Sequence, residues 1–340
     1  MVAGASGYVG GELLRWIEEH PLLELTGATS ERLAGAPLGR VHPHLRGVSD
    51  QRFVSLDDLP EADVLFSALP HGQAAGRIDD WSERFGFWID ASADFRLRDE
   101  GNHGRWYGEG GASQAQRERF VYGLPELNRE ALSSARFASG VGCNATAVHL
   151  ALLPLERAGL LPRTRPIVAG VKVGSSESGA SSNDGSHHPV RSRAVRSYAP
   201  VGHRHTAEVE QTFEGLQLEL SVTAIELVRG ALATCHVPLE AGVSERDVRK
   251  AYARFAANEP FVDFVGPHLG AYGYPEPKLL AGTNRAQIGF AIDPERGRLV
   301  SLCALDNLGK GAAGSAVQSF NLMAGLEETT GLTFRGLHPV

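Results

Sequence analysis

Short apolar runs alternate with polar, glycine-containing segments along the first part of the chain. Leu22–Ala28, Asp63–Leu69 and Phe87–Ser92 have the length and composition of short buried strands. Helical periodicity appears between such runs, as in the segment where Leu13 and Ile17 lie on one face. This alternation of strands and helices predicts an α/β fold with a doubly wound parallel sheet.

The second part of the chain carries a different pattern. Ala231–Val237 and Leu299–Leu305 are alternating or buried strand-like segments, and small apolar residues recur at helical spacing over 311–326. A chain of 340 residues is long enough for two hydrophobic cores. We therefore expect a Rossmann-type domain over 1–142, completed by the helix over 311–326, and an α+β catalytic and oligomerisation domain over 143–306.

A glycine-rich turn opens the chain and precedes a helical segment. Glycines let a backbone approach a pyrophosphate, and the free N–H groups of the following helix attract the anion. The sequence predicts a dinucleotide site here, whose contacts would come from Gly4, Ser6, Gly7, Tyr8 and Val9. Only three residues precede the turn, whereas a strand normally has about five or six, so either the natural start lies upstream or the first strand is short.

The residues after the second predicted strand bear on which dinucleotide binds. Enzymes that use NAD place an acid near this point for the ribose hydroxyls. Here Ser30 and Arg32 could hold a 2′-phosphate, so NADP is favoured. Glu31 would weaken that preference if its side chain turned inward.

Cys143 stands immediately before an apolar helical segment, Ala147–Leu160. A helix N-terminus lowers the pKa of a thiol, and the thiolate is the nucleophilic form. Gly142 leaves room beside the sulfur for a substrate, although a buried structural cysteine is the alternative. Cys235 and Cys303 lie in strand-like segments and are expected to be core residues.

His203, His205 and Glu208 form a second cluster, on a loop that runs into a helix. His205 and Glu208 have the i,i+3 spacing at which a carboxylate can orient an imidazole. An oriented imidazole can act as general acid or base, and either histidine could serve. The alternative is a polar helix start in which these residues only cap the helix.

The segment from Gly185 to Ala207 contains no acidic residue. It carries several basic side chains, namely Arg191, Arg193, Arg196, Arg204, His187 and His188. The arginines would repel one another unless an anion is present, so we expect this segment to bind an anionic substrate or an acidic partner. A solvated loop is the alternative.

The overall composition sets limits on function. A formal charge of −7 argues against a surface built for nucleic acid or anionic membranes. No apolar run reaches the length of a membrane span, and no secretory signal is evident. Three cysteines without paired spacing predict neither disulfides nor a zinc site. A cytoplasmic protein without a metal is expected.

Several ordered motifs together resemble the N-acetyl-gamma-glutamyl-phosphate reductase family. Its members combine a Gly-Ala-Ser-Gly-Tyr turn, a Gly-Cys nucleophile motif and His-x-His-x-x-Glu. Here these motifs and further matching pieces stand at Gly4–Tyr8, Ala68–Gly72, Asp90–Arg96, Gly142-Cys143, His203–Glu208 and Asp306–Gly311. The resemblance spans nearly the whole chain.

Two departures from the arginine-pathway pattern indicate a subgroup. The usual Cys-Tyr-Pro-Thr is replaced by 143–146, Cys-Asn-Ala-Thr, and the usual Ser-Gly-Ala-Gly-Arg by 178–182, Ser-Gly-Ala-Ser-Ser. The Asn-Ala-Thr form is similar to the lysine-pathway branch, whose reductases act on 2-aminoadipate 6-phosphate held on a small acidic amino-group carrier protein. A carrier of that kind would suit the basic segment.

The resemblance implies a mechanism, an assembly and a set of site residues. Cys143 would attack an acyl phosphate to give a thioester, NADPH would reduce the thioester to a semialdehyde, and one histidine, oriented by Glu208, would move the proton. Asn307 would lie near the nicotinamide, and a homo-oligomer, a dimer or tetramer, is expected. The same chemistry on free N-acetyl-glutamyl phosphate or on a carrier-linked glutamyl phosphate stays open, as does a non-catalytic NADP sensor.

Overall fold

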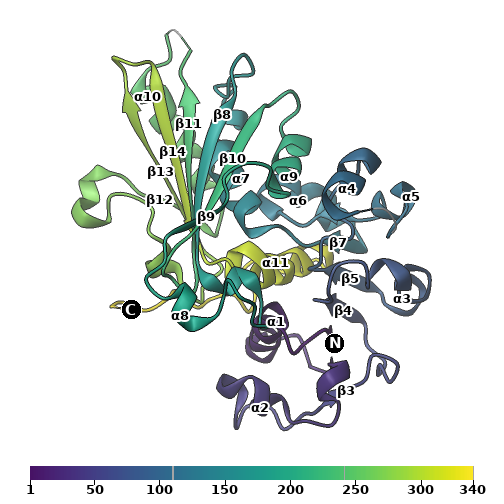
Figure 1. The fold of residues 1–340 in the computed structure, drawn as a ribbon. Helices are drawn as coiled ribbons and strands as arrows, with labels where there is room; N and C mark the ends of the chain where they lie inside the picture. Colours follow the sequence, from purple (N-terminus) through teal and green to yellow (C-terminus); the bar gives the residue numbers. More distant parts are fainter. Residues whose placement is uncertain (109–110, 241, 340) are drawn as a thin grey trace. The chain divides into compact units, whose positions relative to one another are not determined.

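The computed structural model describes residues 1–108, 111–240 and 242–339. The chain divides into two compact units (Figure 1). Unit 1 comprises Met1–Val141 and Ala312–Thr333, and unit 2 comprises Gly142–Gly311 and Phe334–Val340.

Unit 1 is built on a seven-stranded sheet in which every pairing is parallel. The strand order is β3-β2-β1-β4-β5-β7-β6. The strands are β1 (Val2–Ala3), β2 (Ala28–Thr29), β3 (Phe53–Val54), β4 (Val64–Ser67), β5 (Phe87–Asp90), β6 (Val121–Tyr122) and β7 (Phe137–Ser139). The chain moves outward from β1 through β2 and β3 on one side and through β4 and β5 on the other, and β7 then lies between β5 and the edge strand β6. This is the doubly wound arrangement expected from the sequence.

The helices of unit 1 connect these strands. They are α1 (Tyr8–Glu19), α2 (Leu38–Val41), α3 (Ile78–Arg84), α4 (Glu100–Tyr107), α5 (Gln114–Arg117), α6 (Pro125–Ser133) and α11 (Gly314–Met323), with 3₁₀ turns at Glu31–Leu33, Pro43–Leu45 and Ala75–Arg77. α1 buries Leu13, Leu14 and Ile17, the apolar face read from the sequence. α11 follows a π-helical turn at Gly309–Ala313, so the helix expected over 311–326 begins and ends three residues inside those limits.

The prediction of a strand over Leu22–Ala28 is wrong over most of that range. Only Ala28 of Leu22–Ala28 belongs to β2, and Leu22 is 65% exposed. The physical reason is the short neighbouring strand: β1 has two residues, and Val2 pairs with Ala28, so little backbone is available for a longer ladder. The strands expected at Asp63–Leu69 and Phe87–Ser92 are present as shorter strands, β4 and β5.

Unit 2 contains a seven-stranded mixed sheet in the order β12-β13-β14-β11-β8-β10-β9. Its strands are β8 (Ile167–Val173), β9 (Arg196–Ala199), β10 (Leu218–Ala224), β11 (Ala231–Pro238), β12 (Val262–Phe264), β13 (Ala286–Asp293) and β14 (Arg298–Leu305). β8 is parallel to β10 and antiparallel to β11. Cys235 and Cys303 lie on β11 and β14 with no exposed surface, which confirms that they are core residues.

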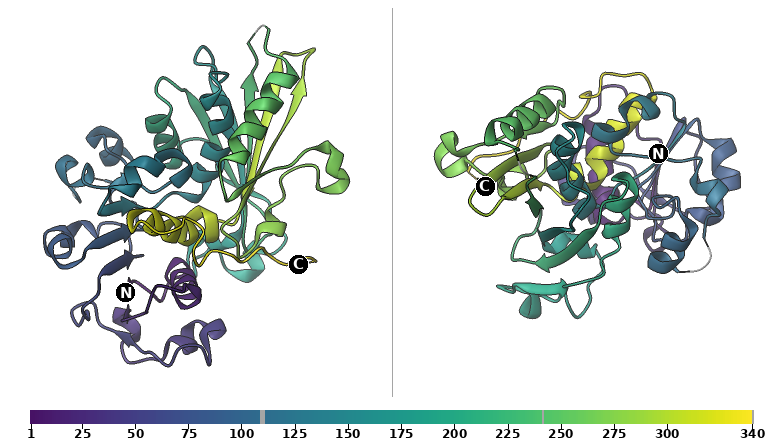
Figure 2. Two further views of the ribbon diagram at one scale, coloured as in Figure 1. Left: turned by 180° about the vertical axis from the view of Figure 1, so that it is seen from behind. Right: turned by 90° about the horizontal axis from the view of Figure 1, so that it is seen from above.

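Helices pack against this sheet (Figure 2). The helices of unit 2 are α7 (Cys143–Arg157), α8 (His188–Arg191), α9 (His205–Thr212) and α10 (Glu245–Ala257), with 3₁₀ turns at Ser175–Ser178, Pro267–Tyr272 and Pro277–Leu280. α7 contacts β8, β11, β13 and β14, whereas α9 contacts β10, and α10 contacts β12 and β13. Alternate residues of β8 and β11 face these helices and are buried, while the residues between them are partly exposed.

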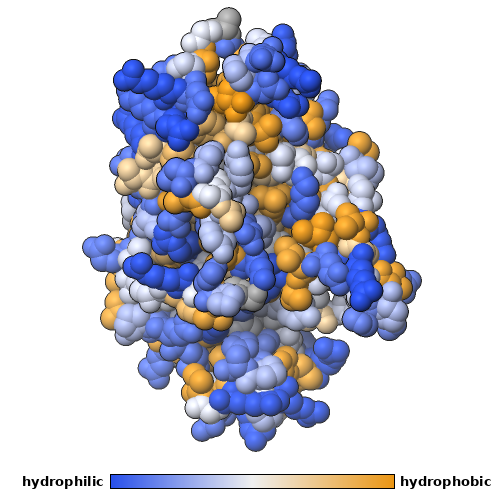
Figure 3. All heavy atoms as spheres, turned by 90° about the vertical axis from the view of Figure 1, so that its left-hand side faces the viewer, coloured by the Kyte–Doolittle hydropathy of each residue, from blue (hydrophilic) through white to orange (hydrophobic). Residues whose placement is uncertain are grey.

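The surface gives no indication of a membrane-spanning element. No helix among the described residues is long and apolar enough to cross a bilayer. On the face drawn in Figure 3, hydrophobic residues form separate groups among hydrophilic ones. Isolated exposed apolar side chains are normal for a folded protein and need no special explanation.

Candidate active site

Cys143 is the first residue of α7, and Gly142 is the N-cap of that helix. Gly142 provides no side-chain cap, and the first turn contains no acidic residue. The helix therefore presents free amide groups and the positive end of its dipole at the sulfur, an environment that favours a thiolate. Cys143 is partly exposed, whereas Cys235 is buried and burial raises the pKa of its thiol to about 12.

His205 and Glu208 pack directly against Gly142. The Gly142 N–H donates to Glu208 Oε2 at 3.0 Å, and Glu208 Oε1 lies 3.7 Å from His205 Nε2. A Cβ added to Gly142 would lie 2.5 Å from His205 Nε2 and 2.7 Å from Glu208 Oε1. The i,i+3 pair expected from the sequence thus exists, and the fold brings it to the residue next to Cys143.

His203 has a different environment from His205. The backbone N–H of His205 donates to His203 Nδ1 at 3.2 Å, so His203 accepts from the first turn of α9. Burial, together with the neighbouring Arg204, lowers the pKa of His203 to about 4. His203 is therefore neutral at physiological pH, with Nδ1 serving as an acceptor.

Three side chains absent from the sequence-based prediction complete this site. Cys143 Sγ lies 3.7 Å from Asn144 Oδ1, and Asn144 Nδ2 donates to Glu177 Oε2 at 3.3 Å. The Tyr198 hydroxyl also donates to Glu177. Burial raises the pKa of Glu177, and the hydrogen bonds from Tyr198 and Asn144 partly offset that effect. Tyr198, the one aromatic residue of the acid-free segment, was the only available signal in the sequence.

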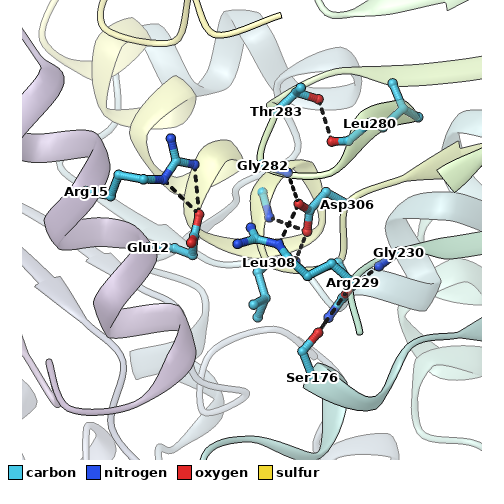
Figure 4. Close-up of polar contacts among 12 residues, drawn as sticks. Glu12, Arg15, Ser176, Arg229, Gly230, Leu280, Gly282, Thr283, Asp306 and Leu308 are labelled. Atoms are coloured by element: carbon cyan, nitrogen blue, oxygen red, sulfur yellow. Dashed lines mark hydrogen bonds and ion pairs between the residues drawn. The ribbon is translucent and has the colours of Figure 1, made fainter. Parts of the chain in front are cut away.

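Asp306 and Asn307 hold the ends of several strands together, as Figure 4 shows for the Asp306 contacts. Arg229 Nε donates to Asp306 at 2.8 Å. Asn307 Oδ1 accepts from the Gly230 N–H at 2.7 Å, and its Nδ2 donates to Ser176 Oγ at 2.9 Å. Asn307 therefore already has structural hydrogen bonds within unit 2.

The segment after Asn307 passes close to Cys143. A Cβ added to Gly311 would lie 2.8 Å from the Cys143 Cβ. Any residue larger than glycine at this position would displace the start of α7. Gly311 is thus explained by close approach to the candidate nucleophile, whereas a Cβ added to Gly309 would collide with the Thr283 carbonyl group.

The basic segment is ordered by hydrogen bonds to backbone carbonyl groups. Arg191 donates to the carbonyl of Ile225 at 2.5 Å, and Arg196 donates to that of Val190 at 3.1 Å. Arg204 and Arg191 also lie close enough to Glu177 to lower its pKa. Arg193 has a positive φ of 57° and is exposed. His187 caps α8 and His188 begins it, and both are exposed.

The glycine-rich turn of unit 1 has the features of a dinucleotide cradle. Gly4 has a φ of +73°, and a Cβ at this position would lie 2.5 Å from the Ala68 carbonyl oxygen. Gly7 is the N-cap of α1 and supplies no side-chain cap, so the first amides of α1 remain for an anion. The buried Glu12 of α1 accepts from Arg15 at 2.8 Å (Figure 4). The glycine turn and the free amides at the start of α1 fit a bound pyrophosphate.

The residues after β2 bear on which dinucleotide could bind. Ser30 Oγ donates to Ser6 Oγ at 2.9 Å, which places Ser30 beside the glycine turn. Glu31 accepts from the Leu56 N–H at 2.5 Å and is thereby held by the backbone after β3. Arg32 is exposed and makes no hydrogen bond or ion pair with the described residues. The described residues also contain no cluster of side chains able to hold a metal ion.

Comparison with known proteins identifies the family. Residues 1–135 match the NAD-binding domain of the semialdehyde dehydrogenases, and residues 143–307 match their dimerisation domain. The chain is 46% identical over 339 residues to the LysW-L-2-aminoadipate 6-phosphate reductase of Deinococcus radiodurans, covering 99% of this chain and 97% of that protein. The chain belongs to the LysW-L-2-aminoadipate/LysW-L-glutamate phosphate reductase family, within the semialdehyde dehydrogenases. It is therefore an oxidoreductase with an NAD(P)-binding domain.

A second member of the family and a solved structure support this placement. The LysW-L-2-aminoadipate/LysW-L-glutamate phosphate reductase of Sulfurisphaera tokodaii is 43% identical over 346 residues, covering 99% of this chain and 98% of that protein. Aspartate semialdehyde dehydrogenase II from Vibrio cholerae has the same fold, with a TM-score of 0.71 at 15% identity over 95% of this chain and 97% of that one. The predicted family, its lysine-pathway branch and the predicted fold class are confirmed.

Proposed function

We propose that this protein reduces a carrier-linked acyl phosphate to a semialdehyde, with release of phosphate. The substrate would be LysW-linked 2-aminoadipate 6-phosphate, or the corresponding LysW-linked glutamyl phosphate, in lysine and arginine biosynthesis, as the names of the relatives indicate. The observation that carries the proposal is the placement of Cys143 at an uncapped helix start beside the His205–Glu208 pair. That arrangement provides a nucleophile and an oriented base.

Cys143 acts first as the nucleophile. His205 takes the thiol proton, and Sγ attacks the carbonyl carbon of the acyl phosphate. The bond between that carbon and the phosphate oxygen breaks, and phosphate leaves with the electron pair. The product of this step is a thioester on Cys143, and the amide groups at the start of α7 stabilise negative charge next to it.

The second step regenerates the thiol. When bound in unit 1, NADPH would supply the hydride that reduces the carbonyl carbon of the thioester. The carbon–sulfur bond then breaks, the aldehyde leaves, and Cys143 departs as a thiolate that the His205 imidazolium reprotonates. Glu208 stabilises that imidazolium because its carboxylate lies 3.7 Å from His205 Nε2.

We assign the proton transfer to His205 rather than His203. A base works best when its pKa is near the operating pH, whereas the pKa of His203 is lowered to about 4. His203 also uses Nδ1 to accept from the His205 N–H, so its role would be to orient α9. His205→Asn should therefore reduce kcat far more than His203→Asn.

NADP is the preferred dinucleotide in this proposal. Gly4, Ser6, Gly7, Tyr8 and Val9 would hold the pyrophosphate, Ser30 and Arg32 would hold the 2′-phosphate, and Asn307 would lie near the nicotinamide. Arg32→Gln should raise KM for NADPH by roughly tenfold and leave KM for NADH unchanged, because a charged hydrogen bond contributes about 1.5 kcal/mol or more. Initial rates with both cofactors provide the measurement, and an equal loss with both would contradict the assignment.

The basic segment would receive the acidic carrier. Exposed valines lie among the basic residues of this segment, including Val195, which is 76% exposed, and Val201, which is 81% exposed. The basic residues near these valines are Arg191, Arg193, Arg196, Arg204, His187 and His188. Basic groups that surround exposed apolar residues suit a partner with an acidic surface.

Arg193→Gln tests this partner assignment, since Arg193 is exposed and forms no contact that the fold needs. It should raise KM for the carrier-linked substrate about threefold to tenfold at low salt, and less at high salt, because screening weakens the attraction. Arg246→Gln, an exposed arginine on α10, is the matched control. Equal effects of the two substitutions would contradict carrier docking at this segment.

The domain boundaries and the assembly also belong to the proposal. The NADP-binding domain would cover 1–142 with the helix over 311–326, and the catalytic and oligomerisation domain would cover 143–306. Residues 143–307 match a dimerisation domain, and the partly exposed face of the unit 2 sheet, which includes Val168, is the surface we assign to a dimer.

The decisive experiment compares substrates and nucleophile variants in parallel. Cys143→Ser should abolish reduction of LysW-linked aminoadipyl and glutamyl phosphates while leaving NADPH binding intact, and Cys235→Ala should remain active. Wild-type turnover with N-acetyl-glutamyl phosphate equal to that with the carrier-linked substrate would reject the carrier. Turnover by Cys143→Ser at the wild-type rate would reject covalent catalysis by Cys143. No turnover of any of these substrates by the wild-type protein, with NADPH still bound, would favour a protein that only binds NADP.

A further inference from the structure

The sulfur of Cys143 has a polar neighbour that the proposed reaction does not use. Its Sγ lies 3.7 Å from Asn144 Oδ1, while Asn144 Nδ2 donates to Glu177 Oε2 at 3.3 Å. A carboxylate can accept hydrogen bonds but cannot donate them. Glu177 therefore fixes the orientation of the Asn144 amide, with the NH₂ group toward Glu177 and the oxygen toward the sulfur.

This orientation is well defined because Asn144 has no exposed surface. Its carboxylate partner lies in the 3₁₀ turn that follows β8 and is also held by the Tyr198 hydroxyl from β9. Asn144 lies in 143–146, one of the two segments in which the sequence departs from the arginine-pathway pattern, and Glu177 directly precedes the other, 178–182. The Asn144–Glu177 hydrogen bond therefore joins the first departure to the residue before the second.

The charged and titratable groups around the sulfur come from several elements. α9 contributes His205 and Glu208 beside Gly142, and the start of α7 contributes its own amides. Tyr198 is close enough to interact electrostatically with Cys143, and Arg204 and Arg191 act on Glu177. The ring of Tyr198 also contacts that of His203, which contacts His205. The helix start and the arginines favour a thiolate, whereas Glu177 and the Asn144 oxygen oppose it.

We propose that Asn144 and Glu177 are positioning residues that hold the resting Cys143 thiol in one orientation and raise the pH at which it ionises. The amide oxygen accepts from the S–H group but repels a thiolate, and the carboxylate behind it adds negative charge. The pair thus opposes the α7 amides, so that the free thiol stays protonated. This inference rests on the proposed function, in which Cys143 is the nucleophile.

Substitution of either residue has a predictable direction. Asn144→Ala removes the acceptor, and Glu177→Gln removes the negative charge while keeping the shape of the side chain. Each should lower the pKa of the Cys143 thiol by about half to one unit. Because only the thiolate reacts, alkylation near pH 7 should become roughly threefold to tenfold faster. Glu177→Asp keeps the charge and should react at close to the wild-type rate.

The test is the pH profile of Cys143 alkylation by iodoacetamide in the full-length protein, followed by mass spectrometry of the Cys143 peptide. Glu295→Gln, an exposed acid in the turn between β13 and β14, is the matched control and should leave the profile unchanged. The buried Cys235 should stay unmodified in every variant, which reports that the fold is intact. Wild-type profiles in both Asn144→Ala and Glu177→Gln, with Cys235 still protected, would overturn the proposal.

The pH profile of kcat/KM separates this inference from the proposed function. In both variants the acidic limb of the profile should move to lower pH in parallel with alkylation, an effect that a merely structural role would not produce. If the alkylation profile shifts but Cys143→Ser retains full activity, the positioning pair stands and the catalytic role of Cys143 fails. If Cys143→Ser is inactive but no profile shifts, the positioning pair alone is wrong.

Discussion

Gly142 shows how one missing side chain allows the proposed catalytic groups to meet. Its φ of −82° is ordinary for any residue, so the backbone itself does not require glycine. Glycine is required here because of neighbouring side chains, since His205 Nε2 and Glu208 Oε1 occupy the space that a Cβ would take. Close packing at this point therefore couples the N-cap of α7 to the orientation of His205, the proposed general base.

Gly142→Ala should lower kcat by roughly 100-fold, because displacing a catalytic group by about 1 Å can have an effect of this size. The added Cβ would lie 2.5 Å from His205 Nε2, so the imidazole or the helix start must move. Steady-state kinetics provide the measurement. Gly104→Ala, where an added Cβ meets nothing within 4 Å, is the control for a glycine-to-alanine change in a folded protein. Wild-type kcat in Gly142→Ala would show that the close contact has no catalytic consequence.

The sequence predicted Cys143 and the histidine cluster as candidate site residues but not all of the neighbours that the structure places beside them. Cys143 and the histidine cluster could be found because each carries a local signal. Cys143 follows a glycine at a helix start, and a histidine of the cluster lies three residues before a glutamate. Glu177 could not be found in this way, since its contact with Asn144 joins segments 33 positions apart. Such a contact depends on how β8 ends, which no local pattern specifies.

At the scale of elements, the packing of α7 against α9 buries a histidine. His149 has no exposed surface, and its Nε2 lies 3.0 Å from Thr212 Oγ1 at the end of α9. Burial lowers the pKa of His149 to about 4, so the folded protein keeps it neutral where the unfolded chain binds a proton. Stability from this neutral imidazole is fully present above pH 6.5 and is lost as the pH falls toward 4.

His149→Gln should reduce the pH dependence of folding. Between pH 7 and pH 5 the wild-type protein should lose about 2 kcal/mol more unfolding free energy than the variant, because one additional proton binds the unfolded chain over most of this range. Urea unfolding at the two pH values measures the difference. The variant is expected to be less stable than the wild type at both pH values. The decisive quantity is therefore the change in unfolding free energy with pH, and not the unfolding free energy at either pH. Identical slopes would show that His149 does not titrate between the folded and unfolded states.

The length of individual strands was harder to predict than their existence. β4 and β5 lie within the runs Asp63–Leu69 and Phe87–Ser92, because continuous apolar residues are needed where both faces of a strand are covered. The run Leu22–Ala28 has similar composition, yet only its last residue pairs with β1. Hydrophobicity indicates what can be buried, whereas ladder length depends on the partner strand.

At the scale of the whole molecule, the two units divide the chemistry. Unit 1 contains the glycine turn with Ser30 and Arg32, and unit 2 contains Cys143 with the groups that act on it. A division of this kind is what the sequence indicates, because the predicted phosphate-binding and nucleophile motifs lie in different parts of the chain. The mixed sheet of unit 2 was not predictable strand by strand, since its antiparallel and parallel pairings join distant segments, such as β8 with β11.

The mixed sheet also supplies the surface for our last prediction. Val168 on β8 is 44% exposed and pairs with His236 of β11, whose side chain is likewise partly exposed. Val168→Glu would place a charge at the centre of the proposed dimer contact, where an unpaired buried charge costs several kcal/mol. The dimer dissociation constant should rise by about 100-fold or more.

Light scattering coupled to size-exclusion chromatography measures this change directly. At micromolar concentration the wild-type protein should elute as a dimer or tetramer and Val168→Glu as a smaller species. Val195→Glu makes the same chemical change at a residue of the basic segment that is 76% exposed, so it controls for added charge and should retain the wild-type mass. If Val168→Glu keeps the wild-type mass while Val195→Glu alters it, the subunits meet through the basic segment, and the carrier must dock elsewhere.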